Sequence, residues 1–213
     1  MPMNTSKIPI PKRGRPPKVA RENQDTRAEL IRSGVELLTE QGFFASGIDK
    51  ILKKVGVPKG SFYHYFASKE VFGRAVIESY ASYFAKKLDS HLLNSDIDPI
   101  QRISNFVEDA KSGMQKHQYK RGCLVGNLGQ EVDVLPESYR QLLLNIFTDW
   151  QARIEACLLE AQQQKLISAK ANCQLQAEFF WVGWEGAVSR ARLVQDAEPL
   201  NNFLSQFIAG LPR

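Results

Sequence analysis

A cysteine beside two basic residues is the feature of this sequence with the most direct chemistry. Cys123 follows Lys120 and Arg121 in the stretch KRGCLVGNLGQE, at the start of a helix predicted over residues 121–133. Positive charge and a helix start both stabilise a thiolate, so one interpretation of Cys123 is a nucleophile with a lowered pKa. Two other interpretations stay open: Cys123 is a small buried hydrophobic residue, or it lines a ligand pocket without reacting.

Catalysis by this cysteine would require a base and an orienting group. The three histidines, His64, His91 and His117, are far apart in sequence, and none lies in a recognisable dyad motif. The sequence also lacks C-x-x-C and H-x-x-x-H spacings, and it contains no G-x-S-x-G, Walker or dinucleotide-binding motif. We therefore expect no enzymatic activity, no metal site and no cofactor. An enzyme acting on an acyl thioester is a remote alternative.

Glycines recur in two segments that otherwise favour helices. A glycine inside a helix costs roughly 0.5–1 kcal/mol relative to alanine, so its repetition needs a physical reason. Either a neighbouring helix packs closely against the bare face, or the face leaves room for a molecule other than protein. The glycines are Gly122, Gly126 and Gly129 around Cys123, and Gly183 and Gly186 in EFFWVGWEGAVSRARL.

Aromatic side chains near these glycines would give a ligand pocket an apolar lining. The alternative is close helix packing, and we expect the helices of residues 172–210 to pair across a dimer axis. The expected ligand-binding residues are Phe106, Cys123, Asn127, Phe147, Trp150, Trp181 and Trp184.

Charge separates a basic first third from a near-neutral remainder. Residues 1–79 contain 14 Lys and Arg against 8 Asp and Glu, whereas the remainder contains 14 against 15. This asymmetry suggests that the first third meets a polyanion, although a solvated basic surface is the alternative. Residues 1–23 are rich in proline and basic residues, which predicts a flexible arm.

Two arginines in this arm suggest a second contact with nucleic acid. Arg13 and Arg15 lie in KRGRPPK, whose R-G-R-P core resembles the AT-hook. Arginines flanking a glycine fit the narrow minor groove of A·T-rich DNA, where the potential is most negative. Plain attraction to phosphate is the alternative.

The elements that must position these residues are all helical, because no segment shows sustained alternation of apolar and polar residues. Ser46 and Ser68 are expected to cap the second and fourth helices, and Pro58 to be the first residue of the third. The expected helices cover about 25–41, 48–55, 58–66, a long fourth helix after Ser68, 99–117, 121–133, 137–164, 172–194 and 198–210.

No apolar run is long enough to span a membrane, and three cysteines are too few for a disulfide framework, so a reducing cytoplasm is expected.

Two short helices around the turn at Gly56 form a helix-turn-helix pattern. Burial of Phe62 and Phe66 would leave the polar side chains of the second short helix exposed. Tyr65 is either a further core residue or a contact to phosphate. Lys59 can then bond a phosphate or a guanine edge, and hydroxyl groups can bond phosphate oxygens.

The stretch GVPKGSFYHYFASKEVFG resembles the recognition-helix signature of TetR-type bacterial transcriptional regulators, with AELIRSGVELLTEQGFFASGIDKILKKV before it. The resemblance implies an all-α homodimer with a three-helix DNA-binding head and a larger helical domain for ligand binding and dimerisation. It divides the chain into an arm (1–23), a head (24–84, with the helix-turn-helix at 47–66) and an effector domain (85–213). The expected DNA contacts are Arg13 and Arg15 of the arm and, by matched position, Ser46, Lys59, Gly60, Ser61, Tyr63, His64, Tyr65 and Lys69. Pro58 replaces the Ser or Thr cap of many relatives, which removes a hydroxyl contact.

The stretches RGCLVGNLGQE and FFWVGWEGAVSRARL are similar to those of acrylate-responsive repressors within this family. The likeness implies a cytoplasmic repressor that releases double-stranded operator DNA when it binds a small effector such as acrylate or acryloyl-CoA. Another branch has a similar GCL stretch and is inactivated by electrophiles at the matching cysteine. An electrophile-sensing repressor that uses Cys123 is therefore the alternative function.

Overall fold

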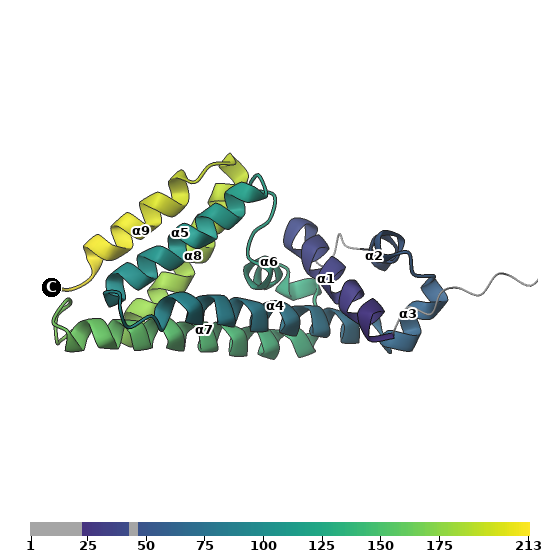
Figure 1. The fold of residues 1–213 in the computed structure, drawn as a ribbon, viewed down its shortest axis with the longest axis horizontal. Helices are drawn as coiled ribbons and strands as arrows, with labels where there is room; N and C mark the ends of the chain where they lie inside the picture. Colours follow the sequence, from purple (N-terminus) through teal and green to yellow (C-terminus); the bar gives the residue numbers. More distant parts are fainter. Residues whose placement is uncertain (1–22, 43–46) are drawn as a thin grey trace, which may run out of the picture.

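The computed structural model describes residues 23–42 and 47–213 (Figure 1). Within these ranges the regular structure is entirely helical, which confirms the all-α prediction. The elements are α1 (Asn23–Gln41), α2 (Ile48–Val55), α3 (Lys59–Tyr65), α4 (Lys69–Leu92), α5 (Pro99–Lys116), α6 (Leu124–Gln130), the 3-10 helix η1 (Val132–Val134), α7 (Glu137–Gln163), α8 (Cys173–Val194) and α9 (Glu198–Gly210).

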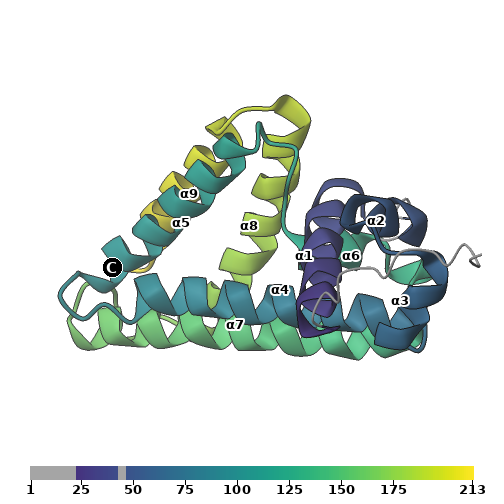
Figure 2. The same cartoon turned by 45° about the vertical axis from the view of Figure 1, so that its right-hand side comes forward.

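The helices form a small group at one end of the molecule and a larger group along the rest of it. Helices α1, α2 and α3 gather at one end, where α1 packs on α2 and on α4. Helices α4 and α7 run side by side along the molecule, and α5, α8 and α9 rise from them (Figure 2). Because α4 packs against α1 and also against α5 and α7, it belongs to both groups.

Several helix starts differ from the sequence-based expectation. The expected helix at 121–133 is shorter, because Gly122 precedes it and Cys123 is its N-cap, with Sγ accepting a hydrogen bond from Gly126 N at 3.4 Å. The N-cap of α2 is Gly47, which has no side-chain oxygen, and Ser46, the expected cap, lies outside the described residues. Pro58 is the N-cap of α3 and not its first residue, because its backbone is extended (ψ 145°). The Ser68 cap of α4 is confirmed by a 3.1 Å bond from Val71 N.

An aromatic cluster holds the three-helix end against the start of α4. The rings of Phe62 and Phe66 lie 5.5 Å apart, and both pack on Phe72 of α4 at 5.5 and 4.9 Å. Phe62 and Phe66 are buried, as the sequence predicts, while Tyr65 is half-buried and packs against the core. These contacts set the direction of α3 relative to α4.

Both ends of α4 are tied to other helices by hydrogen bonds. At its start, the Tyr139 hydroxyl of α7 donates to Glu70 O at 2.7 Å, and Arg74 donates to Ser138 O at 3.2 Å. At its end, the buried Arg102 guanidinium donates to Leu92 O at 3.0 Å. The last carbonyl groups of a helix have no partner within it, so Arg102 stabilises this terminus.

The close approach of α1 and α4 depends on Gly34. A Cβ atom at this position would lie 2.7 Å from Val76 Cγ2 and 2.8 Å from Phe72 Cζ, both in the core. We expect Gly34→Ala to lower the free energy of unfolding by about 1–3 kcal/mol, because overpacking outweighs the gain in helix propensity. Urea unfolding followed by circular dichroism measures the change. Gly113→Ala on α5 is the control, since its nearest atom is Lys87 Nζ at 4.0 Å.

Candidate nucleic-acid interface and ligand cavity

The outer face of α3 presents the polar residues that the sequence singles out for nucleic-acid binding. Burial of Phe62 turns the opposite side of this short helix to solvent, where Tyr63 is 57% exposed. Ser61 and Tyr65 are half-buried, and Lys59, Gly60, His64 and Lys69 are exposed. Arg13, Arg15 and Ser46 lie outside the described residues.

This face can exchange its internal contacts for contacts with phosphate. Lys59 Nζ lies 3.2 Å from Asp49 of α2, and both side chains are largely exposed. An exposed ion pair of this kind contributes little, so a DNA phosphate can replace Asp49 at small cost. A Cβ atom on Gly60 would meet nothing within 4 Å. Packing within the protein therefore does not require glycine at this position.

A cavity of about 280 Å³ lies where α1, α4, α5 and α8 meet the segment before α6. Its lining includes Cys123 and Trp184, which the sequence names, and the cavity is bordered by Lys87, His117 and Arg121. Lys87 and Arg121 are each paired with a carboxylate, Asp109 at 3.0 Å and Glu40 at 2.9 Å. The lining residues are Val35, Thr39, Tyr80, Tyr83, Phe84, Lys87, Ala110, Gly113, Met114, His117, Arg121, Gly122, Cys123, Trp184 and Val188.

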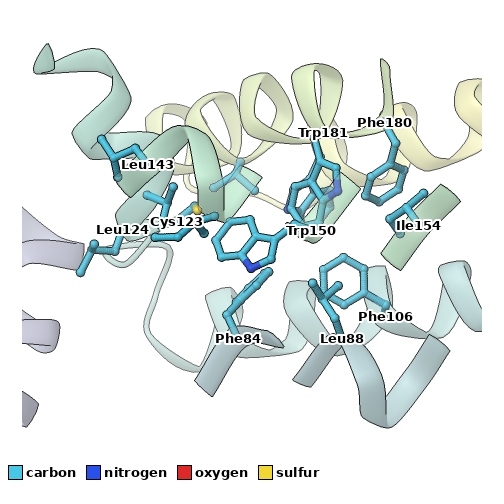
Figure 3. Packing of buried hydrophobic residues seen from close by; sticks show 14 of the residues in the cluster. Phe84, Leu88, Phe106, Cys123, Leu124, Leu143, Trp150, Ile154, Phe180 and Trp181 are labelled. Atoms are coloured by element: carbon cyan, nitrogen blue, oxygen red, sulfur yellow. The ribbon is translucent and has the colours of Figure 1, made fainter. Parts of the chain in front are cut away.

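The other residues expected to bind ligand are placed elsewhere. Phe106, Trp150 and Trp181 are fully buried in an aromatic core, with Trp150 5.1 Å from Trp181 between ring centres (Figure 3). Phe147 packs edge-on against Trp150 at 5.8 Å. Asn127 turns its amide to α1 and donates to Thr39 O at 3.2 Å. Phe84 connects this core to the cavity, because it lines the cavity and its ring lies 4.5 Å from Trp150.

Of the three interpretations of Cys123, the structure favours a buried residue that lines the cavity over an activated thiol. Burial, followed by the neighbouring Glu185 carboxyl, raises the pKa of Cys123 well above its ordinary value. The basic neighbours do not offset this effect, because Lys120 is exposed and Arg121 pairs with Glu40. Loss of hydration destabilises the thiolate more than the helix start stabilises it.

Two further ionisable groups face this thiol from the adjacent helices, Tyr80 on α4 and Glu185 on α8. Burial raises the pKa of Glu185 to about 7, and burial together with Cys123 raises the pKa of Tyr80. Atom Oε1 of Glu185 is buried and makes no hydrogen bond with the described part of the chain. Neither residue is among those predicted from the sequence, because they lie 43 positions before and 62 positions after Cys123.

The glycines around Cys123 make room for charged side chains of α8. A Cβ atom on Gly122 would lie 2.7 Å from Arg192 Cδ, and one on Gly126 would lie 2.6 Å from Glu185 Oε1. Gly129 meets nothing within 4 Å. Side chains of α8 therefore pack closely against Gly122 and Gly126. This supports close packing, and not room for a ligand, as the reason for these two glycines.

Comparison with known proteins agrees with the two groups of helices in the structure, the small group around α1 to α3 and the larger group of the later helices. A family model described as "Bacterial regulatory proteins, tetR family" matches residues 30–76, and one described as "Tetracyclin repressor-like, C-terminal domain" matches residues 99–207. The transcriptional regulator AcuR of Cereibacter sphaeroides is 45% identical over 92% of this chain and 90% of its own length. The repressor DhaR of Mycobacterium sp. strain GP1 is 31% identical over 84% of this chain and 88% of its own length.

A solved structure extends the likeness to the whole arrangement of helices. The crystal structure of regulatory protein TetR from Rhodobacter sphaeroides is 45% identical in sequence and has a TM-score of 0.85. The match covers 87% of this chain and 98% of that one.

The open space above Gly60 allows DNA binding to be separated from folding. We expect Gly60→Ala to keep or raise thermal stability, because alanine favours a helix by about 1 kcal/mol. The added methyl group should weaken binding to DNA from the region upstream of the gene by about tenfold, or ~1.4 kcal/mol. Fluorescence anisotropy and thermal unfolding measure the two effects. Equal affinity in both proteins would mean that the backbone here does not approach DNA.

The two environments of the α6 glycines give a matched pair of variants. Gly126→Ala should destabilise the fold by about 1–3 kcal/mol, because its methyl group displaces the confined Glu185 carboxyl. Gly129→Ala should stabilise it by roughly 0.5–1 kcal/mol, since its methyl group enters open space. Guanidinium unfolding of both variants provides the comparison, and equal stabilities would refute this account of the glycines.

Proposed function

We propose that this chain, which belongs to the tetR family of bacterial regulatory proteins, is a homodimeric repressor controlled by acrylate or acryloyl-CoA. The family and the relatives compared above are transcriptional regulators and not enzymes. The observation that carries the proposal is the position of α4. It follows the polar, exposed α3 directly and lines the cavity with Tyr80, Tyr83 and Phe84.

DNA binding follows from α3 and the residues around it. Two such helices in a symmetric dimer enter successive major grooves when they lie about 34–36 Å apart. Lys59, Tyr63 and His64 offer donors to phosphates and base edges. The arm of residues 1–23 adds Arg13 and Arg15, which we assign to the adjacent minor groove.

Dimerisation is supported by an exposed apolar stripe on α8. Leu175, Phe179, Val182 and Leu193 are 56%, 57%, 68% and 75% exposed, and their spacing places them on one side of the helix. Gly186 lies in the same row and has open space above it. Exposed apolar side chains aligned on one side of a helix are typical of a protein–protein interface, and a second copy of the chain is its proposed partner.

Effector binding is supported by the size and lining of the cavity. A volume of about 280 Å³ suits a small acyl group, and Phe84, Met114 and Val188 give it apolar walls. The basic residues at its border can attract a carboxylate or the phosphate groups of a nucleotide thioester. The resemblance of the segments around Cys123 and in α8 to acrylate-responsive repressors indicates acrylate or acryloyl-CoA.

The buried thiol favours reversible binding over covalent capture. An electrophile reacts with the thiolate, and the raised pKa of Cys123 leaves the thiol protonated near neutral pH. The electrophile-sensing repressor is accordingly the second candidate, since Cys123 does line the cavity.

The place of action proposed for this repressor is the bacterial cytoplasm, where operator DNA is accessible. Within residues 23–42 and 47–213, no helix combines the length and apolar character needed to cross a membrane. We also retain the division into arm (1–23), head (24–84) and effector domain (85–213) as part of the proposal.

A DNA-binding titration on the chain's own upstream region tests this function. Wild type, Cys123→Ser and the control Cys157→Ser are each challenged with acrylate, acryloyl-CoA, propionyl-CoA and N-ethylmaleimide. We expect acrylate or acryloyl-CoA to raise the apparent Kd for DNA by roughly 5–150-fold in all three proteins, which is the usual range of allosteric coupling. Cys157 is a suitable control because it is buried and its thiol donates to Pro99 O at 3.2 Å.

Other results would assign a different mechanism. Loss of the response in Cys123→Ser alone, with added mass on the wild-type protein, would establish the electrophile sensor. No release by any compound would refute the acrylate proposal while leaving the DNA-binding function in place. No binding to the upstream DNA would contradict the repressor itself.

A further inference from the structure

The last carbonyl groups of α1 are bound by residues of the effector domain. Thr39 O accepts from Asn127 Nδ2 at 3.2 Å and from Gly122 N at 3.4 Å, and Glu40 O accepts from Arg192 at 3.1 Å. Such carbonyls lack partners within their own helix and carry a partial negative charge. The effector domain therefore supplies the polar termination of a helix that belongs to the DNA-binding head.

Arg192 joins three elements at this point. Its Nη1 donates to Asn127 Oδ1 at 3.0 Å, and its Nη2 reaches Glu40 O and, at 3.4 Å, Lys120 O. The rigid fork of a guanidinium suits such divergent bonds, whereas a lysine ammonium cannot reproduce its planar geometry. We refer to Arg192 and Asn127, with the carbonyls of Thr39 and Glu40, as the α1 clamp.

The α1 clamp adjoins the wall of the ligand cavity. Thr39 and Gly122, which share one of its hydrogen bonds, both line the cavity. On α8, Val188 lines the cavity one turn before Arg192, and Glu185 lies two turns before it on the same face. The absence of side chains at Gly122 and Gly126 lets Arg192 and Glu185 reach these positions.

These contacts connect the cavity to α1 through one short path. A ligand that pushes on Val188 or on the Thr39–Gly122 wall changes the distance between α8 and the end of α1. The bonds of Arg192 and Asn127 break or rearrange at displacements of about 1 Å, because hydrogen bonds weaken steeply beyond their usual length. Helix α1 packs on α2 and α4, so its displacement reaches the recognition helix.

We propose that the α1 clamp, centred on Arg192, couples occupancy of the cavity to the position of the DNA-binding head. Arg192 is a positioning residue in this role, since it touches neither the DNA face nor the cavity. The inference rests on the proposed function, because it assumes that a ligand in this cavity controls DNA binding. Tight capping of α1 holds the head in one orientation, and occupancy of the cavity favours the state in which the clamp is open.

The test compares Arg192→Gln, Arg192→Lys and Asn127→Ala with the matched control Arg190→Gln. Arg190 is exposed on the same helix and makes no hydrogen bond or ion pair identified among the described residues. For each full-length protein we would measure the Kd for operator DNA without acryloyl-CoA and at saturation. Tryptophan fluorescence would give the Kd of the free protein for acryloyl-CoA, since Trp184 lines the cavity.

We expect acryloyl-CoA to bind Arg192→Gln with a Kd within about threefold of wild type, while its effect on the operator Kd falls by about tenfold or more. Arg192→Lys should restore part of the coupling, and Arg190→Gln should match wild type. A role of Arg192 in folding alone would lower stability and leave the coupling ratio unchanged. Coupling equal to wild type in both Arg192→Gln and Asn127→Ala would overturn the proposal.

Hydrogen exchange separates failure of the clamp from failure of the proposed function. Loss of the clamp should speed exchange at the end of α1 in Arg192→Gln, whether or not any effector is present. Unchanged exchange there would overturn the clamp. A wild-type protein that binds operator but ignores acryloyl-CoA would instead refute the proposed effector, and faster exchange in the variant would still support the clamp.

Discussion

The packing of α4 into two cores at once is the constraint on which the rest of the structure depends. Its first turns complete the aromatic cluster of the head through Phe72, and its later turns join the effector core through Phe84 and Leu88. Hydrogen bonds from Tyr139 and Arg102 fix its two ends. A helix held in this way cannot tilt at one end without movement at the other, because close-packed interiors change between discrete arrangements.

A group of three ionisable side chains lies where the helices of the two parts meet. Tyr80, Cys123 and Glu185 come from α4, the start of α6 and α8, and burial raises the pKa of each. The raised pKa values reflect the cost of placing a charge in this poorly hydrated location. Tyr80 and Cys123 line the cavity and give its wall hydrogen-bonding capacity beside apolar residues, which is the combination that orients small ligands.

The glycines, like α4, bring helices of the two parts of the molecule into close contact. Gly34 lets α1 approach α4, and Gly122 and Gly126 let the side chains of Arg192 and Glu185 pass over the start of α6. Each lies where a side chain of another helix packs closely against the backbone. A methyl group at these positions would collide with Val76 and Phe72, Arg192 or Glu185.

The helical class, the order of the elements and the polar face of α3 are predictable from the amino-acid sequence alone. These features depend on local patterns: the spacing of Phe62 and Phe66, the Ser68 cap and the turn at Gly56. Helix ends were predicted to within a few residues, and the largest departure is the start of α6, where Gly122 stays outside the helix. The cavity and the clamp were not predictable in this way. The reactivity of Cys123 depends on desolvation by residues distant in the chain, and Asn127, Phe106 and Trp150 acquire their positions from neighbours that only the folded packing brings together. Burial and long-range contacts are properties of the tertiary structure, and no local spacing of residues encodes them.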